Sequence, residues 1–385
     1  MPTFYEFFAG GGMVRAGLGP NWSCLFANDF DPKKAQSYLE NWGADELLLE
    51  DIRNVGLDDL AGQADLVWGS FPCQDLSLAG NGAGLRGNRS GTFYPFINTI
   101  KELIADDRAP RFIALENVVG TLTSHKGADF KAICKALFNL DYKLGALVVD
   151  AANFLPQSRP RLFVIAVHKN TPIPAGLIQK AASAPWHSKA LQTAFDSLSA
   201  RERANWIWWH LPSAAARQMD LADIIEDHPE SVKWHSARET TALLSMMSEV
   251  NLAKVETARN AKTRMVGTIY KRTRREHGIK VQRAEIRFDD IAGCLRTPAG
   301  GSSRQLVMVI EGSKIRSRLM SSRETARLMG LPETYKLPER YNQAYHLTGD
   351  GVAVPVVRFI AQHIFEPCLS RASTEARTDE SDTLR

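Results

Sequence analysis

The sequence predicts an α/β fold: a mainly parallel sheet flanked by helices, joined to a second, smaller domain. Residues 1–170 alternate short strand-like runs with helix-like segments, a pattern typical of parallel sheets with helical crossovers. The alternation stops near Thr171, where prolines such as Pro172 and Pro185 interrupt the chain, and a helical pattern returns at Ser322. The length of 385 residues, 44% of them hydrophobic, is ample for two cores.

The individual elements follow from residue type and spacing. Runs of β-branched and aromatic residues are expected to be strands, namely Thr3–Phe8, Cys24–Asn28, Asp65–Trp68, Phe112–Leu115, Tyr142–Val149 and Leu162–Val167. Helices are expected over Met13–Leu18, Pro32–Asn41, Phe96–Ile104, Phe130–Leu140, Ser322–Met329 and Val352–Ile364. Asp31 is expected to cap the second helix, because Pro32 occupies its first position.

Composition excludes several classes of protein. No apolar run approaches the roughly 20 residues that span a bilayer, and Met1–Phe8 lacks the basic leader of a secretory signal. The five cysteines are scattered, so neither a disulfide framework nor a zinc cluster is expected. We therefore expect a reduced, cytoplasmic protein without a metal site.

Positive charge is unevenly spread along the chain. The net charge is only +4, yet residues 254–287 hold eleven Lys or Arg against three Glu. Such a run either covers a solvated helix or hairpin or contacts a polyanionic partner. Both interpretations stay open at this point.

Two early segments suggest a bound cofactor. Gly10, Gly11 and Gly12 follow the first strand and open a helix, where free N–H groups and close backbone approach favour a ligand. Asp29 ends the second strand, a common place for an acid that accepts ribose hydroxyls. The alternative is that Asp29 or Asp31 only caps the next helix.

Polar residues also follow the later strands. Cys73 lies in Gly-Ser-Phe-Pro-Cys-Gln-Asp-Leu-Ser, a polar loop directly after the third strand. Most cysteines are buried hydrophobes, and a thiol needs a nearby cation, helix start or base to become a nucleophile. Glu116 ends the fourth strand and could equally be a capping or ion-paired acid. Arg159 and Arg161 lead into the last strand, where a spacing of two favours one face.

In this order and spacing, the segments resemble the cytosine-5 DNA methyltransferase family of bacterial or phage type. The resemblance is carried by Gly-Ser-Phe-Pro-Cys-Gln-Asp-Leu-Ser, then Glu-Asn-Val, then Gln-Ser-Arg-Pro-Arg. Phe-Phe-Ala-Gly-Gly-Gly near the start is similar to the family's cofactor loop, and residues 322–332 and 349–354 are similar to its last two motifs. Residues 171–293 match no segment that we can name.

The resemblance implies an S-adenosylmethionine-dependent methyltransferase fold and a specific reaction. The enzyme would transfer a methyl group from S-adenosylmethionine to carbon 5 of cytosine in a specific double-stranded DNA sequence. It implies covalent attack by Cys73 on carbon 6 of a flipped-out base, with Glu116 at ring nitrogen 3 and the exocyclic amine. Arg159 and Arg161 would orient the base carbonyl and stabilise charge. Residues 72–91 would be long enough to close over the base.

The resemblance also assigns cofactor contacts. They are Phe8, Ala9, Gly10, Gly12, Asp29, Asp51, Ile52, Pro72, Asp350 and Val352. Two positions depart from the family pattern. Asp350-Gly351 stands where Asn and a small residue are usual, which puts the late cofactor contact in doubt, and Cys294 stands where Thr is frequent.

Four regions are expected. They are a catalytic and cofactor-binding domain (1–175), a target-recognition domain (176–320), helices of which the last packs back on the catalytic domain (321–370), and a disordered tail (371–385). The residues expected to contact DNA are Arg89, Lys271, Arg272, Arg274, Arg275, Ser302 and Arg304. A cognate restriction endonuclease acting on the same site is left open, and the location is expected to be the cytoplasm, with the nucleoid.

Three other functions compete with this interpretation. A transfer RNA methyltransferase of the same superfamily would share the catalytic motifs but carry a short target segment, unlike the long stretch after Thr171. A catalytically silent DNA-binding relative would not need Cys73 and Glu116 intact. An oxidoreductase that uses NAD would not need the Phe-Pro-Cys-Gln segment.

Overall fold

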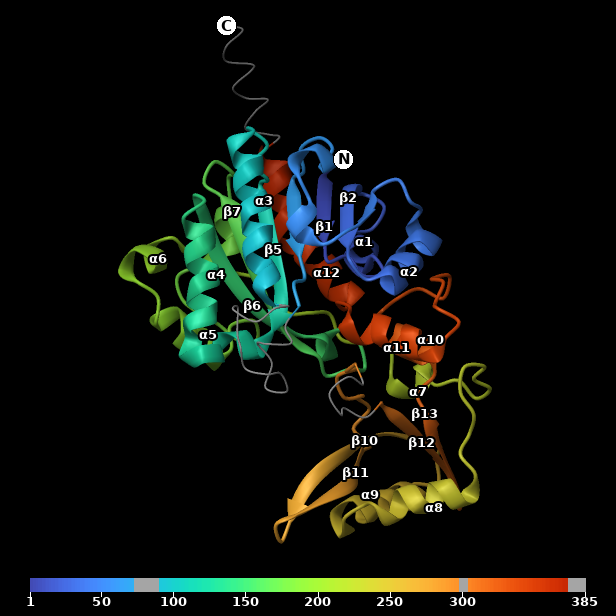
Figure 1. Ribbon diagram of the computed structural model, residues 1–385. Helices are drawn as coiled ribbons and strands as arrows, with labels where there is room; N and C mark the ends of the chain where they lie inside the picture. Colours follow the sequence, from blue (N-terminus) through green and yellow to red (C-terminus); the bar gives the residue numbers. More distant parts are fainter. Residues whose placement is uncertain (73–89, 298–303, 373–385) are drawn as a thin grey trace, which may run out of the picture. The chain divides into compact units, whose positions relative to one another are not determined.

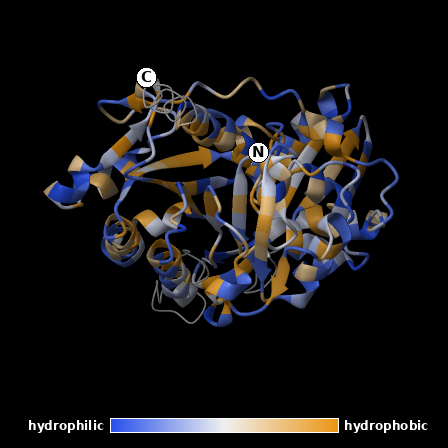
Figure 2. Ribbon diagram, turned by 90° about the horizontal axis from the view of Figure 1, so that it is seen from above, coloured by the Kyte–Doolittle hydropathy of each residue, from blue (hydrophilic) through white to orange (hydrophobic). Residues whose placement is uncertain are grey.

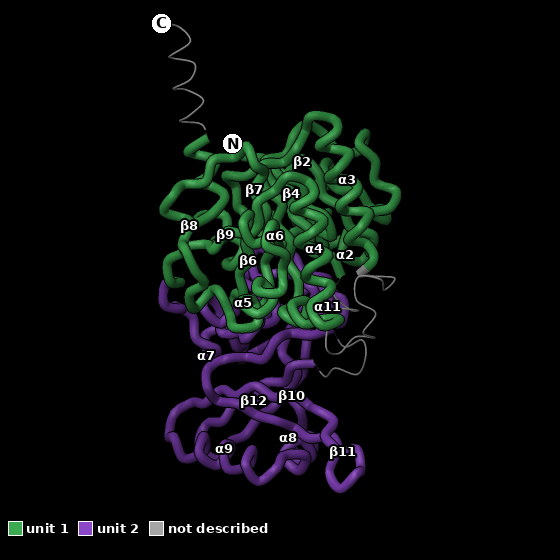
Figure 3. Tube along the Cα trace, turned by 90° about the vertical axis from the view of Figure 1, so that its left-hand side faces the viewer, with its two compact units in different colours: residues 1–149, 160–214, 354–385 green, residues 150–159, 215–353 purple. Residues whose placement is uncertain are grey.

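The computed structural model describes residues 1–72, 90–297 and 304–372, which form two compact units. Unit 1 comprises Met1–Val149, Pro160–Ala214 and Val354–Arg385, as far as these ranges are described. Unit 2 comprises Asp150–Arg159 and Ala215–Ala353 (Figure 3).

Unit 1 is built on a nine-stranded sheet in the order β3-β2-β1-β4-β5-β7-β6-β9-β8 (Figure 1). The first five strands in this order pair in parallel, β7 runs antiparallel to β5, and β9 runs parallel to β6. The strands are β1 (Thr3–Phe7), β2 (Ser23–Asp29), β3 (Leu47–Leu49), β4 (Leu66–Gly69), β5 (Phe112–Val118), β6 (Tyr142–Asp150), β7 (Pro160–His168), β8 (Ile178–Gln179) and β9 (Trp206–Trp209). The predicted fold class, a mainly parallel sheet, is confirmed.

Helices cover both faces of this sheet. They are α1 (Met13–Leu18), α2 (Pro32–Trp42), α3 (Phe93–Ala105), α4 (Ala128–Phe138), α5 (Lys189–Asp196), α6 (Ala200–Ala204) and α12 (Val354–Ile360). On one face, Phe96 of α3 and Ile133 of α4 join a core with Ile113 of β5. On the other, the ring of Phe112 lies 5.1 Å from that of Phe365, which follows α12. Hydrophobic residues therefore run along the strands instead of alternating with polar ones (Figure 2).

The helices of unit 1 start where the sequence indicates. Asp31 caps α2 by accepting a hydrogen bond of 2.9 Å from the Lys33 amide, and Pro32 takes the first helical position. Gly17 of α1 allows close packing on α12, since a Cβ atom there would lie 2.5 Å from Cβ of Val357. Arg358 strengthens this contact by donating to the Leu18 carbonyl at 2.8 Å.

Unit 2 contains a four-stranded antiparallel sheet in the order β11-β10-β12-β13. The strands are β10 (Met265–Glu276), β11 (Ile279–Arg287), β12 (Leu306–Glu311) and β13 (Lys314–Leu319). The helices are α7 (Leu221–Ile224), α8 (Ala237–Ser245), α9 (Glu249–Asn260), α10 (Ser322–Arg327) and α11 (Tyr341–Asp350). Leu243 of α8 and Val255 of α9 pack on Ile269, Ile286 and Met308 of the sheet, which gives unit 2 its own core.

The limits of the two units differ from the four regions expected from the sequence. Residues 176–214 lie with unit 1, because Trp206 and Ile207 of β9 pair with β6 and extend the main sheet. Gly145 makes room for this strand, since a Cβ atom there would lie 2.3 Å from Nε1 of Trp209. Helices α10 and α11 lie with unit 2. Which residues select the DNA sequence stays a prediction.

Three further observations bear on the class of protein. Cys24, Cys134, Cys294 and Cys368 are free thiols, and no group of His, Cys, Asp or Glu among the described residues could hold a metal ion. One helical stretch, Tyr341–Ala372, is long and apolar enough to cross a membrane by length and composition. Because 56% of its most apolar window is buried, it equally fits a core helix, so the evidence for a span is weak.

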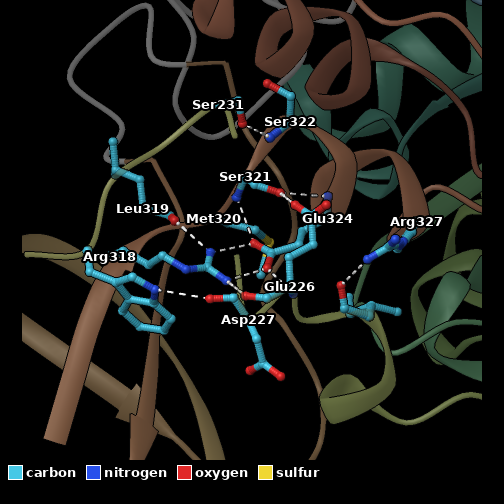
Figure 4. A network of polar contacts seen from close by, with 12 residues as sticks. Glu226, Asp227, Ser231, Arg318, Leu319, Met320, Ser321, Ser322, Glu324 and Arg327 are labelled. Atoms are coloured by element: carbon cyan, nitrogen blue, oxygen red, sulfur yellow. Dashed lines mark hydrogen bonds and ion pairs between the residues drawn. The ribbon is translucent and has the colours of Figure 1, made fainter. Parts of the chain in front are cut away.

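A buried ion pair holds α10 within unit 2 (Figure 4). Arg318 and Glu324 are fully buried, and the guanidinium donates to both carboxylate oxygens at 2.7 and 2.6 Å. Glu324 also accepts from the amides of Ser321 and Glu226, each at 2.7 Å. The guanidinium in turn donates to the Glu226 carbonyl at 2.6 Å and lies 4.6 Å from the ring of Trp234. The pair thus ties β13, α10 and the segment before α8 together.

We predict that Arg318→Met lowers the free energy of unfolding by about 3 to 5 kcal/mol, because it leaves the Glu324 carboxylate buried without its partner. Arg316→Met is the matched control, since Arg316 also lies over Trp234, at 4.4 Å, but pairs with Glu311 near the surface. The control should lose less than about 1 kcal/mol. Urea unfolding measures both variants, and equal losses would contradict the role of the buried pair.

Candidate active site

The loop after β1 has a backbone that only a few residue types adopt. Phe8, Gly10 and Gly12 have φ angles of 60°, 57° and 74°, in the left-handed region. Trp42, at the end of α2, donates from Nε1 to the Gly11 carbonyl at 3.0 Å. A Cβ atom on Gly12 would lie 2.4 Å from that nitrogen. Trp42 of α2 therefore holds this loop in place. The left-handed backbone favours glycine at positions 10 and 12, and the lack of space also requires it at position 12.

Asp29 joins the ends of β1 and β2. One carboxylate oxygen accepts from the Gly10 amide at 2.8 Å, and the other accepts from the Asp31 amide at 2.8 Å. Burial raises the pKa of Asp29, against the opposing effects of Lys34 and these two amides. Since Asp31 caps α2, Asp29 is not needed as that cap, and its carboxylate instead fixes the glycine loop. The capping role therefore belongs to Asp31, and the ribose contact of Asp29 stays a prediction.

Sequence reasoning missed two residues at this end of the sheet. Phe30 is 63% exposed although it is a large aromatic residue directly after Asp29. Glu6 is 1% exposed in β1, and its two oxygens accept from the amides of Val14 and Arg15 at 3.3 and 3.2 Å. Burial raises the pKa of Glu6 to about 8 in spite of these bonds. An acid inside an apolar strand just before the glycine loop was the available signal for Glu6.

Asp51 and Ile52 have structural roles of their own. Asp51 accepts from the Arg53 amide at 2.9 Å and pairs with its guanidinium at 3.1 Å, so it starts the short 3₁₀ helix Ile52–Asn54. Ile52 is 4% exposed and belongs to the core of unit 1. Contacts of these two residues with an adenine stay a prediction.

The segment that leads to Cys73 is anchored by Asn117 of β5. The Asn117 amide donates to the Phe71 carbonyl at 3.3 Å, and its oxygen accepts from the Val118 amide and the Thr121 hydroxyl at 2.9 and 3.2 Å. This fixes the chain one residue before Pro72. Cys73 itself, like Arg89 and Ser302, lies outside the described residues.

Glu116 and Arg161 form an ion pair in unit 1. Arg161 Nε lies 3.0 Å from a Glu116 oxygen, and both side chains are mostly buried. The pair crosses the antiparallel ladder of β5 and β7, in which Val118 opposes Arg161. The ion-paired state expected as one alternative for Glu116 is therefore present, and it orients the carboxylate.

Arg159 binds carbonyl groups of distant segments. In unit 2 its guanidinium donates to the carbonyls of Leu295, Gly349 and Gly351 at 3.1, 2.9 and 2.6 Å. The Cys294 thiol lies 3.4 Å from the same group. The sequence predicts that Arg159 and Arg161 lie on the same face of a strand. Because β7 begins at Pro160, Arg159 lies outside the strand, and the alternation of side chains along a strand does not apply to it. Gly349 and Gly351 flank Asp350, and Val352 is buried at 4% exposure.

The residues expected to contact DNA lie in different settings. Arg272 and Arg274 both pair with Glu285, whereas Arg275 is exposed and Lys271 is half-buried. Arg304 donates to the Asn342 side chain at 2.6 Å and lies over the Tyr341 ring. None of these contacts tests DNA binding.

The sheet, the glycine loop and the acid at the end of β2 together define an α/β enzyme class with a cofactor site at the carboxyl ends of parallel strands. Comparison identifies the family within it. The chain belongs to the C-5 cytosine-specific DNA methylase family, whose model matches residues 2–366.

Relatives and solved structures agree with this membership. The chain is 25% identical to the Type II methyltransferase M.BsuFI of Bacillus subtilis, covering 93% of this chain and 71% of the relative. It is also 25% identical to M.HpaII of Haemophilus parainfluenzae, covering 94% and 89%. The structures of Entamoeba histolytica EhMeth (TM-score 0.63, 14% identity, 95% and 98% covered) and of a Spodoptera frugiperda DNMT2 mutant (0.60, 16%, 95% and 100%) share the fold.

The protein is therefore an enzyme, a DNA (cytosine-5-)-methyltransferase, as the sequence predicted. Membership of a methyltransferase family implies S-adenosylmethionine as the methyl donor. DNA is the substrate that the family description names.

We predict that the Glu6 carboxyl makes stability depend on pH. Its pKa of about 8 in the fold lies above the ordinary value of 4.5 for a glutamate, so folding favours the neutral form. The resulting stability is complete below the unfolded pKa and is lost as pH rises through about 8. Relative to Glu6→Gln, the wild-type free energy of unfolding should fall by about 1 kcal/mol per pH unit between these values. A difference between the two proteins that stays constant from pH 5 to 8 would contradict this.

Proposed function

We propose that Cys73 attacks carbon 6 of a target cytosine that has swung out of duplex DNA. The observation that carries this proposal is the arrangement around the end of β5. Asn117 anchors the segment before Cys73, and its neighbour Glu116 is held by Arg161. A nucleophile segment, an acid and a guanidinium are thus supported by β4, β5 and β7, which are neighbours in the sheet.

Each group has a separate chemical task in this mechanism. Addition of the Cys73 thiolate to carbon 6 makes carbon 5 nucleophilic, and carbon 5 then takes the methyl group. Glu116 holds a proton at ring nitrogen 3 as negative charge builds in the ring. Arg161 orients Glu116 and the base carbonyl. Removal of the proton at carbon 5 and loss of the thiolate restore the aromatic ring and release Cys73.

The residues at the carboxyl ends of β1 and β2 fit S-adenosylmethionine, which supplies a methyl group already activated as a sulfonium. Each Asp29 oxygen accepts one amide, so lone pairs remain for two ribose hydroxyls. The exposed ring of Phe30 offers an apolar surface beside it. The remaining proposed contacts are Phe8, Ala9, Gly10, Gly12, Asp51, Ile52, Pro72, Asp350 and Val352.

We assign Arg159 a positioning role instead of contact with the base. Arg159 is 2% exposed. Its guanidinium donates to the carbonyls of Gly349 and Gly351, the residues on either side of Asp350. It therefore holds the loop that carries one proposed cofactor contact. Cys294 takes part in the same cluster, where the family often has Thr.

The substrate is proposed to be a specific double-stranded sequence, recognised within the expected region 176–320. The ordered Glu116–Arg161 pair supports catalysis against a silent, purely DNA-binding role, and the long segment after Thr171 supports DNA against transfer RNA. A cognate restriction endonuclease and a location at the nucleoid stay predictions.

We predict that duplex DNA with 5-fluorocytosine at the target position traps a covalent adduct through Cys73, because fluorine cannot leave as a proton does. Peptide mass spectrometry should place the adduct on Cys73. Cys73→Ala should form no adduct and no product while still binding DNA, since phosphate contacts supply most of the affinity. Cys24→Ala is the control and should trap normally. Normal methylation by Cys73→Ala would exclude the mechanism.

We predict that Glu116→Gln lowers the single-turnover rate by about a hundredfold to ten-thousandfold, because an acid positioned on the base contributes this much. Binding of S-adenosylmethionine, measured by calorimetry, should change little. Arg161→Met should also lower the single-turnover rate and change the binding of S-adenosylmethionine little, because the substitution removes the guanidinium that orients the Glu116 carboxylate. An unchanged rate in either variant would count against the assigned roles.

A further inference from the structure

The outer half of the β10–β11 hairpin is a two-stranded ribbon. β12 pairs with β10 only over Met265–Ile269, whereas β11 pairs with β10 as far as Glu276. Figure 1 shows β10 and β11 continuing past β12. The ribbon closes through His277 and Gly278, both with positive φ, as in a two-residue hairpin turn. Among the described residues, no third strand therefore pairs along the edge of β10 beyond Ile269.

The register sorts the polar side chains onto two faces, because opposed residues share a face and successive pairs alternate. Thr273 opposes Gln282 and Arg275 opposes Lys280. We call these four exposed residues the basic face. The opposite face, called the paired face, carries Arg272, Arg274, Glu276, Arg283 and Glu285.

On the paired face, the three arginines all pair with the two glutamates of the same face. Arg274 Nε donates to Glu285 at 2.5 Å, and Arg272 Nε lies 3.4 Å from the same carboxylate. Arg283 Nε donates to Glu276 at 2.7 Å, and this bond lowers the pKa of Glu276. The guanidinium groups of this face are thus directed to carboxylates of the same face.

Charges on the basic face have no such counterpart. Within the described part of the chain, neither Arg275 nor Lys280 has an ion pair. Beside these two cations lie the side-chain amide of Gln282 and the hydroxyl of Thr273. Both are neutral groups that donate and accept hydrogen bonds. Unmatched cations favour a polyanion, and neutral donor-acceptor groups suit base edges.

We infer that the basic face is the surface with which this methyltransferase reads duplex DNA, Arg275 and Lys280 contacting phosphates and Gln282 a base edge. A two-stranded ribbon fits the major groove, which is about 12 Å wide, and Gln pairs bidentately with adenine there. The inference rests on the proposed DNA substrate. The sequence predicts that Arg272, Arg274 and Arg275 all contact DNA. The inference keeps this contact for Arg275 only.

Binding to a 30-base-pair duplex at several salt concentrations tests the face assignment. Arg275→Gln with Lys280→Gln should reduce the dependence of log affinity on log salt by about two units, one for each lost phosphate contact. Arg272→Gln with Arg274→Gln removes the same net charge from the paired face and should change the slope by less than half as much. Equal changes in the two double variants would overturn the assignment. Because all four positions are exposed, circular dichroism should show both variants folded as the wild type.

Mapping of methylated cytosines in a randomised duplex library tests Gln282. Gln282→Ala should weaken the preference at one base pair by about 5- to 100-fold and leave the other positions unchanged, as loss of one bidentate contact does. If Gln282→Ala keeps the wild-type base preference at every position, the role of Gln282 is wrong. If the substitution affects structured RNA but not duplex DNA, the assignment of duplex DNA as the ligand is wrong. Methylation by the wild type reports on the proposed function independently of either result.

Discussion

The site depends on the parallel pairing of β1, β2, β4 and β5. Phe7 aligns with Asn28 on one side and with Gly69 on the other, and Gly69 aligns with Leu115. The glycine loop, Asp29, the segment before Cys73 and Glu116 each begin within two residues of this row. Positions more than a hundred residues apart in sequence thus reach one edge of the sheet, because parallel strands end together. Any shift in register would misplace these groups relative to one another.

Hydrogen bonds made by polar side chains then fix the loops at this edge. Asp29 holds Gly10, Asn117 holds Phe71, and Glu6 holds the start of α1. Each of these side chains is almost fully buried. A buried polar group that lacks a hydrogen-bond partner destabilises the fold, so these hydrogen bonds are needed for stability. The cost of burying the acids is visible in the raised pKa values of Glu6 and Asp29.

The sequence predicted the six strands β1, β2, β4, β5, β6 and β7, the helix cap at Asp31 and the family, because these depend on local residue type and order. It did not predict the partners of Arg159, since contacts with Gly349 and Gly351 require the fold of a distant segment. It missed β9 as part of the main sheet, because a Trp-rich run of four residues carries little information on its pairing partner. It also grouped Arg272, Arg274 and Arg275 as one basic run, whereas strand alternation places Arg275 on the other face from Arg272 and Arg274, which share the carboxylate of Glu285.

The most direct measurement is the identity of the methylated nucleoside. Duplex DNA incubated with the protein and S-adenosylmethionine that carries a deuterated methyl group would be digested and analysed by mass spectrometry. The account predicts that the label appears in 5-methyldeoxycytidine, at one defined sequence. Label on a ring or exocyclic nitrogen instead, or in transfer RNA while duplex DNA stays unmodified, would contradict it.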